Sequence, residues 1–379
     1  MKVLIVVTHL LGTGHLSRAL TLGRACARAG HDVWVMSGGR PAPHMDYTGL
    51  QLVQLPSIAS DGTNFSRLLQ EDSTEVDDAF MQRRIEAAVS SLRDIQPDVI
   101  VTELFPFGRR SLSNEFQAIL QAAQEMNIRP RIVCSIRDIL APPSKPSKAE
   151  KAQALLTEYY DAVLVHSDPG IVALEESWPV TPEVAKLLRY TGFVSPPASS
   201  PHPDNVAEGE VLVSAGGGSV GQALFECAVD AAHLSDRHWR LLVGGADAAQ
   251  RIEALQQRAG DLDITIEGVR PDFRQMLHGA AASVSMCGYN TALDLLQTGI
   301  PAVLVPFDDG GEVEQTLRAK SLAHQSAMDV LTARDATAEM MAALVEKVIQ
   351  EGRRHGEDLQ MQGANQTVNI LEKLAGGPA

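Results

Sequence analysis

The sequence predicts an α/β protein with two Rossmann-like domains, each built on a parallel sheet. At 379 residues, the chain is long for one domain and suits two of about 150–200 residues each. Short runs rich in Val and Ile alternate with amphipathic stretches, which is typical of βαβ units. This alternation stops in a polar, proline-rich segment and then starts again, so the chain contains two such halves.

The first domain is predicted to span residues 1–195. Its N-terminus is interpreted as a strand and not as a signal peptide, because the apolar run leads directly into a glycine-rich turn and the only basic residue is Lys2. Helices are expected at residues 16–29 and around 75–95. Strands are expected at residues 3–7, 32–36, 53–55, 98–102, 132–135 and 162–166.

Residues 196–210 are polar and proline-rich, and they are predicted to form an interdomain linker. The second domain is expected at residues 211–379, with its last helix free to pack back on the first domain. Each of its strands is followed by a helical stretch. These strands are expected at residues 211–214, 240–243, 264–266, 282–285 and 302–305.

The net charge of −15 is concentrated in the second half of the chain. Up to Ser195 there are 19 Lys and Arg against 22 Asp and Glu, and after it there are 13 against 25. Binding to nucleic acid through its phosphates requires a basic surface, so a nucleic-acid partner is excluded. If the acidic half binds a nucleotide diphosphate, it must use backbone amides and helix N-termini.

The cysteines and the hydropathy indicate a cytoplasmic protein. The chain has four cysteines without paired spacing, which argues against a disulfide framework and structural zinc and favours a reducing compartment. Nor does any apolar run approach the roughly 20 residues of a transmembrane helix. These cysteines are Cys26, Cys134, Cys227 and Cys287.

No metal site is expected. Asp261 and Asp263 form an Asp-x-Asp pattern, but they introduce a predicted strand just after a glycine and are interpreted as turn residues. Three histidines lack the partner spacing of metal ligands. They are His44, His202 and His324.

The most informative segment covers residues 286–294, where a predicted strand ends and a helix begins. Gly288 allows close approach of a ligand to the backbone, and Asn290 or Thr291 can cap the helix. The helix N-terminus then offers free N–H groups to a diphosphate. Asp294, one turn later, can accept hydrogen bonds from ribose hydroxyls. An ordinary capped helix would show the same pattern.

Further motifs surround this segment. Pro306 and Phe307 follow it, then the pair Glu314 and Gln315. A strand, glycine turn and helix start are predicted across residues 213–219, although a single glycine turn is weak evidence.

Together these motifs resemble the C-terminal signature of UDP-glycosyltransferases. They also resemble that of the N-acetylglucosaminyltransferase that forms lipid II in bacterial peptidoglycan synthesis. The resemblance implies the GT-B architecture, in which two Rossmann-like domains face each other across a cleft.

The same resemblance implies roles for individual residues of the second domain. Asp294 contacts the ribose, whereas Glu314 and Gln315 bind hexose hydroxyls, for which a carboxylate and an amide together accept and donate hydrogen bonds. Backbone groups around Val269 contact the base. The donor-binding residues implied are Gly217, Gly218, Ser219, Val269, Gly288, Tyr289, Asn290, Thr291, Asp294, Glu314 and Gln315.

The sequence departs from the family pattern in two places. Met286 stands where plant and animal UDP-glycosyltransferases have a phosphate-contacting His, and the loop from Pro306 to Gln315 is longer than usual. Both departures leave the phosphate contacts and the exact sugar open.

The turn Gly12-Thr13-Gly14-His15 directly follows the first strand, and it matches a Gly-His turn of the same families. Open α/β sheets place their chemistry at this edge. The resemblance makes His15 the catalytic base on the acceptor side. Glu103, at the end of another strand, matches the carboxylate that orients this His; alternatively, it faces solvent or pairs with Arg109 or Arg110.

The predicted function is inverting, metal-independent transfer of a hexose or N-acetylhexosamine from a UDP-sugar, expected to be UDP-N-acetylglucosamine or UDP-glucose. No cofactor is implied, because the UDP-sugar is a co-substrate. The acceptor is a small molecule or a lipid-linked molecule, which leaves peripheral membrane contact open. Residues 142–148 are interpreted as a flexible segment on the acceptor side. Two alternatives remain: a sugar-nucleotide 2-epimerase using Glu103 and Glu314, and a non-catalytic sugar-nucleotide binder.

Overall fold

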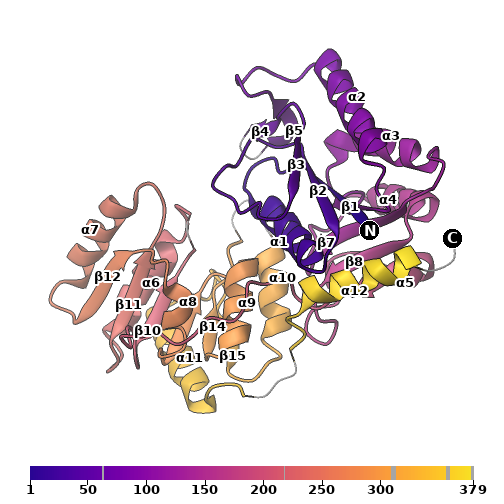
Figure 1. Cartoon of the computed structure of the whole chain (residues 1–379). Coiled ribbons are helices and arrows are strands. Elements are labelled where there is room, and N and C mark those ends of the chain that lie inside the picture. Colours follow the sequence, from indigo (N-terminus) through magenta and orange to yellow (C-terminus); the bar gives the residue numbers. More distant parts are fainter. Residues whose placement is uncertain (62–63, 217, 309–312, 356–358, 377–379) are drawn as a thin grey trace. The chain divides into compact units, whose positions relative to one another are not determined.

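The computed structural model describes residues 1–61, 64–216, 218–308, 313–355 and 359–376 of the chain (Figure 1). The chain forms two compact units. Unit 1 comprises Met1–Pro169, Ala173–Val194 and the chain from Gln360 onward, and unit 2 comprises Gly170–Val172 and Ser195–Leu359.

Unit 1 is built on a seven-stranded sheet with the strand order β3-β2-β1-β6-β7-β8-β9, in which every neighbouring pair is parallel. A short antiparallel pair, β4 (Ala59–Asp61) and β5 (Asn64–Leu69), lies outside this sheet. The strands of the main sheet are β1 (Lys2–Val7), β2 (Asp32–Ser37), β3 (Gln51–Gln54), β6 (Val99–Glu103), β7 (Arg131–Arg137), β8 (Ala162–His166) and β9 (Leu188–Tyr190).

The apolar run at the N-terminus forms β1 because both faces of this strand are covered. Val3, Ile5 and Val7 belong to one buried hydrophobic cluster, whereas Leu4 and Val6 belong to another on the opposite face. A strand buried on both faces has no polar alternation, which explains its continuous apolar sequence. The helices of unit 1 are α1 (Gly14–Arg28), α2 (Asp78–Ile95), α3 (Ser113–Gln124), α4 (Pro146–Tyr159), α5 (Pro182–Leu187) and α12 (Gly363–Gly376), with 3₁₀ turns at Arg110–Leu112 and Leu174–Glu176.

The C-terminal helix α12 lies in unit 1, beside α1 (Figure 1). Val368 and Leu371 are buried in the same hydrophobic cluster as Leu16 and Leu20 of α1. The chain that leaves unit 2 therefore completes the core of unit 1.

Unit 2 has a six-stranded sheet with the order β12-β11-β10-β13-β14-β15, again parallel throughout. Its strands are β10 (Val211–Ser214), β11 (Trp239–Val243), β12 (Ile264–Gly268), β13 (Ala282–Ser285), β14 (Ala302–Leu304) and β15 (Met328–Val330). Its helices are α6 (Gln222–Ala232), α7 (Ala248–Ala259), α8 (Phe273–Met276), α9 (Tyr289–Thr298), α10 (Glu314–Leu322) and α11 (Ala338–Glu351). Two α/β domains with parallel sheets were expected, and this prediction is confirmed.

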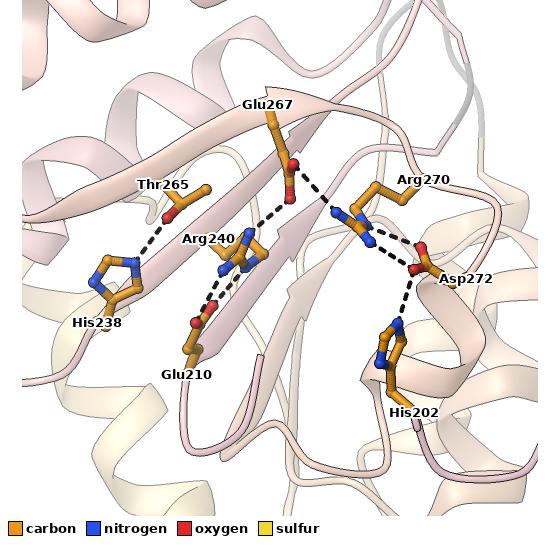
Figure 2. Close-up of polar contacts among 8 residues, drawn as sticks. All are labelled: His202, Glu210, His238, Arg240, Thr265, Glu267, Arg270 and Asp272. Carbon is orange, nitrogen blue, oxygen red and sulfur yellow. Dashed lines mark hydrogen bonds and ion pairs between the residues drawn. The ribbon is translucent and has the colours of Figure 1, made fainter. Parts of the chain in front are cut away.

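Residues 196–210, for which composition indicates a linker, instead form part of unit 2. His202 contacts Asp272 at 3.0 Å, and Glu210 accepts two hydrogen bonds from Arg240, at 2.6 and 3.0 Å (Figure 2). Ala207 is only 2 % exposed. His202 and Glu210 are thus ion-pair partners of residues in the loops and the sheet of unit 2, which composition cannot reveal.

Residues 142–148, expected to be flexible, include the start of α4. Pro146 is in the first turn of this helix. Proline suits that position because its fixed φ is helical and its missing N–H would have no helical partner.

In each sheet, the chain first adds strands on one side of the first strand and then on its other side. The point where the strand order reverses is called the switch point, and each unit has one. In unit 1 the chain moves from β1 to β2 on one side, and β6 pairs with β1 on the other. In unit 2 the corresponding pair is β10 and β13. Ligands of open α/β sheets bind at the carboxyl ends of the strands at such points.

Candidate active site

His15 lies in the first turn of α1, the helix that follows the switch-point strand β1 after a short loop. Thr13 precedes the helix, and its carbonyl oxygen accepts from Ser17 N–H at 2.8 Å. A Cβ placed on Gly12 or Gly14 would meet no atom within 4 Å. The start of α1 is therefore open, and the His15 side chain is 20 % exposed.

Glu103, the last residue of β6, lies against His15. Nδ1 of His15 is 2.8 Å from Oε1 of Glu103, whose side chain is 1 % exposed. The same Oε1 accepts from the guanidinium of Arg18, one turn along α1. The structure thus brings His15 and Glu103 together, and Glu103 pairs with Arg18 and not with Arg109 or Arg110.

The contacts define the tautomer of His15. An ionised carboxylate can only accept, so the 2.8 Å contact with Glu103 requires a proton on Nδ1. Nη2 of Arg18 lies 3.2 Å from the same Nδ1 and, with that proton in place, acts on it as a nearby positive charge. The lone pair of His15 is then on Nε2, for which no described residue is a hydrogen-bond partner.

A buried chain of hydrogen bonds holds the other oxygen of Glu103. Ser135 Oγ, from β7, donates to Oε2 at 2.7 Å. Its single proton is thereby used, so the 3.0 Å contact with His166 Nε2 is donated by the imidazole. His166 Nδ1 lies 2.8 Å from Thr191 Oγ1. Sequence reasoning missed Arg18, Ser135 and His166.

Burial and charge determine the protonation of this cluster. Burial lowers the pKa of His15 to about 4; Glu103 opposes this effect, and Arg18 and Arg109 add to it. Burial alone would raise the pKa of Glu103, but Arg18 and His15 outweigh it and hold that pKa well below its usual range. Burial also lowers the pKa of His166 to about 3. At neutral pH the site therefore contains neutral imidazoles beside an ionised carboxylate and a guanidinium.

The switch point of unit 2 is lined by glycine-rich loops. Between β10 and α6 the backbone adopts positive φ at Gly216 (82°) and Gly221 (84°), a conformation that favours glycine. Gly218 and Ser219 lie exposed in this loop, and Gly217 lies outside the described residues. The helix α6 begins only at Gln222, after the predicted motif has ended.

The second loop leads from β13 into α9. The cap of α9 is Gly288, and no side chain caps it; Asn290 and Thr291, predicted as caps, lie inside the first turn. A Cβ on Gly288 would meet nothing within 4 Å. The start of α9 therefore has no side-chain cap and is open at Gly288, as the approach of an anion to a helix N-terminus requires. The side chain of Tyr289 packs against Arg318, whose Cζ lies 5.7 Å from the centroid of the tyrosine ring.

Asp294 lies on α9 and pairs with Arg274, whose Nε donates to Oδ1 at 2.7 Å. Arg274 also donates to Gln297 Oε1 and to the carbonyl of Pro197. Burial raises the pKa of Asp294, and Arg274 opposes this effect. The carboxylate is 14 % exposed, so it remains accessible from one side.

Glu314 and Gln315 form the first turn of α10 and also have internal partners. Glu314 accepts from Arg318 at 2.9 Å, and Arg318 in turn donates to the carbonyl of Cys287, next to the α9 cap. Gln315 Oε1 accepts from the N–H of Phe307 at 3.2 Å, which leaves its amide NH₂ to donate. These contacts join α10 to the start of α9.

Val269, predicted to contact the base through its backbone, follows β12. Its side chain is 48 % exposed, and its N–H donates to the carbonyl of Val243 at 3.2 Å. Only its carbonyl oxygen remains for a ligand.

Within the parts of the chain that the structure describes, no group of three or more His, Cys, Asp and Glu is arranged to hold a metal ion. Asp263 is 98 % exposed and lies 3.4 Å from His238. None of the described helices combines the length and apolar character needed to cross a membrane.

The chain has two α/β units with parallel sheets, a His–carboxylate pair at one switch point and glycine-rich loops at the other. These features are typical of the GT-B class of glycosyltransferases. Residues 212–374 match the glycosyltransferase family 28 C-terminal domain.

Over 94 residues, 23 % of this chain, the sequence is 31 % identical to a UDP-N-acetylglucosamine–N-acetylmuramyl-(pentapeptide) pyrophosphoryl-undecaprenol N-acetylglucosamine transferase from Anaeromyxobacter sp. (strain Fw109-5). The match spans a quarter of the length of that relative.

Solved structures of glycosyltransferases match the whole chain. MurG from Acinetobacter baumannii superposes with a TM-score of 0.64 at 17 % identity, covering 98 % of this chain and 100 % of MurG. A UGT transferase from Siraitia grosvenorii, solved with UDP, gives 0.60 at 13 % identity, with coverage of 98 % and 100 %. The calicheamicin glycosyltransferase CalG4 gives 0.60 at 17 % identity, with coverage of 99 % and 95 %. The GT-B fold and the predicted resemblance to both families are confirmed.

Proposed function

We propose that the chain is an inverting, metal-independent glycosyltransferase that transfers a hexose or N-acetylhexosamine from a UDP-sugar to an acceptor. The observation that carries the proposal is the His15–Glu103 contact of 2.8 Å, which leaves Nε2 of His15 as the free base. The family 28 domain and the name of the matched relative favour a UDP-sugar donor. No cofactor is needed.

In the proposed reaction, His15 Nε2 removes the proton of the acceptor nucleophile. The nucleophile attacks the anomeric carbon on the face opposite UDP, the carbon–oxygen bond to UDP breaks, and UDP leaves with the electron pair. The configuration inverts in this single displacement. Glu103 stabilises the imidazolium that forms, as carboxylates do in other His-based sites.

Donor binding is assigned to unit 2. The helix N-terminus of α9 and the glycine-rich loop after β10 meet the charge that grows on UDP, a role otherwise taken by a metal ion. Asp294 binds ribose hydroxyls, and Gln315, with its free NH₂, binds the hexose together with Glu314. The acceptor is a small molecule or, as the name of the matched relative suggests, a lipid-linked one.

The 2-epimerase alternative is less well supported by the contacts of its two carboxylates. Glu103 is buried and paired with Arg18, and Glu314 is paired with Arg318 at 2.9 Å. Glu103 is a poor proton donor, because Arg18 and His15 hold its pKa well below the usual range.

A donor panel followed by acceptor screening tests this proposal. A UDP-sugar is expected to raise the melting temperature, and the stabilising donor is then incubated with acceptors in the presence and absence of EDTA. UDP release that requires an acceptor and is insensitive to EDTA supports the proposal. Isomerisation of the sugar nucleotide without an acceptor would favour the epimerase. Loss of turnover in EDTA, restored by Mg²⁺ or Mn²⁺, would contradict metal independence and return Asp261 and Asp263 to consideration.

A further inference from the structure

We propose that Arg18 is a positioning residue that keeps His15 uncharged by neutralising Glu103. The inference builds on the proposed role of His15 as a base. The charge state that it assigns to His15 can, however, be measured without any reaction, so the two proposals fail separately.

The guanidinium of Arg18 lies against both Glu103 and His15. Arg18 donates to the same Oε1 of Glu103 that accepts from His15, and its Nε lies 3.5 Å from Oε2. Its Nη2 is 3.2 Å from Nδ1 of His15. The Arg18 side chain is 7 % exposed, so water screens these interactions only weakly. Because His15 and Arg18 are three residues apart on α1, the helix itself holds them on one face.

This arrangement changes the charge balance of the site. In an isolated His–carboxylate pair, proton uptake by the imidazole converts a net charge of −1 into an ion pair, which favours the imidazolium. Here Glu103 and Arg18 already cancel, so a proton on His15 leaves the buried cluster with a net charge of +1. Such a charge is costly in a buried site, and the imidazole stays neutral.

The other groups around the pair add no second anion. Arg109, in the loop after β6, lowers the pKa of His15 further, and Arg137 at the end of β7 acts on Arg109. His166 on β8 is neutral because burial lowers its pKa to about 3. The Cys134 thiol of β7 is also neutral, since burial raises its pKa well above the usual value.

The consequence for the reaction is a base that is ready over the whole physiological range. Arg18 donates to Oε1 of Glu103 and Ser135 donates to Oε2, so the carboxylate is held in one orientation toward His15. Replacing Arg18 is therefore expected to change the protonation of His15, and not only the stability of the fold.

Long-range ¹H–¹⁵N spectra of the full-length chain, labelled at histidine, measure this directly as a function of pH. A His15→Asn variant assigns the His15 signals. Removing the guanidinium in Arg18→Gln is expected to raise the pKa of His15 by about 1–3 pH units, the usual effect of a nearby charge. Glu103→Gln is expected to lower it, because Arg18 then stands alone. Arg24→Gln is the matched control, since Arg24 lies on the same helix but pairs with the exposed Asp46, 3.5 Å away.

Arg18→Gln leaves Glu103 buried without its cation, which threatens folding. The double variant Arg18→Gln/Glu103→Gln avoids this, and its comparison with Glu103→Gln isolates Arg18 a second time. The same increase in the pKa of His15 is expected there. An unchanged pKa of His15 on removal of Arg18, in whichever background folds, would overturn the inference.

In the parent chain and the Arg18 variants that retain glycosyl transfer, the acid limb of the pH–rate profile is expected to follow the pKa of His15 measured by NMR. A limb that stays in place while the NMR value moves would leave the charge assignment standing and remove His15 as the base.

Discussion

The switch points of the two units share a topology but differ in what lines them. In unit 1, buried side chains of α1 and β7 hold the Glu103 carboxylate at the end of β6, and His166 of β8 continues this chain of hydrogen bonds. In unit 2, the corresponding edge consists of glycine-rich backbone and an uncapped helix start. Its acidic side chains, Asp294 and Glu314, are each paired with an arginine.

This difference teaches how one fold, used twice, can serve two purposes. Proton transfer needs a base whose tautomer and charge are set in advance, which a buried network provides. Diphosphate binding needs accessible N–H groups and little steric bulk, which glycines at a helix start provide. We therefore assign proton transfer to unit 1 and donor binding to unit 2.

The largest expected effect is on catalysis in unit 1. His15→Ala is expected to reduce kcat roughly 10²–10⁴-fold with an aliphatic alcohol acceptor, the range for a positioned general base. Glu103→Gln is expected to reduce it less, because Glu103 orients His15 and stabilises its charge. Steady-state kinetics measure both. A loss below about tenfold for His15→Ala would exclude the general-base role; a phenol or thiol acceptor, already partly ionised, would not be decisive.

The pH dependence of the rate tests the same role of His15 as the base. Because burial lowers the pKa of His15 to about 4, the imidazole is neutral above that pH and takes up a proton below it. The rate is expected to stay level down to about pH 4 and then to fall about tenfold per pH unit. This limb should be absent in His15→Ala. A limb near pH 6.5 would show that the base is not in this environment.

Asp294 gives the next largest effect, on donor binding. Asp294→Ala is expected to weaken UDP and UDP-sugar alike by about 1–3 kcal/mol, the cost of removing a charged hydrogen-bond partner. Arg274→Met is the matched control, since it breaks the same 2.7 Å ion pair and keeps the carboxylate. Equal weakening in both variants, measured by calorimetry, would mean that the ion pair matters and not a ribose contact.

The smallest effect is expected at Gln315. Gln315→Ala removes one neutral hydrogen bond and is expected to weaken the UDP-sugar by about 0.5–1.5 kcal/mol while leaving UDP unchanged. Gln325→Ala, at a partly exposed position after α10, serves as the control. Equal weakening of UDP and UDP-sugar would contradict the assignment of Gln315 to the hexose.

The sequence predicted the central strands because they are buried on both faces and rich in Val and Ile. The predicted strands at 162–166, 211–214 and 282–285 coincide with β8, β10 and β13. It did not predict β9 and β15, which are three residues long at the edges of the sheets and too short to show a period.

The candidate site was predictable where a motif marks the chain locally, as at His15 and Gly288. Ser135 and His166 could not be recognised, because strand pairing alone brings them to Glu103, from 32 and 63 positions away in the sequence. Arg18 did leave a signal, since a residue three positions after His15 in a predicted helix must share its face. The prediction that Asn290 or Thr291 caps α9 was wrong, because Gly288 occupies the cap position and makes no side-chain hydrogen bond.

Calorimetric titration of the stabilising UDP-sugar into His15→Ala tests the division between the units most directly. We expect a dissociation constant within about twofold of the parent, because unit 2 is assigned to hold the donor and a loss of about 1.4 kcal/mol would already change it tenfold. The same preparation must show the large loss of kcat. A dissociation constant raised tenfold or more in a folded variant would place His15 in the donor site and contradict the assignment of donor binding to unit 2.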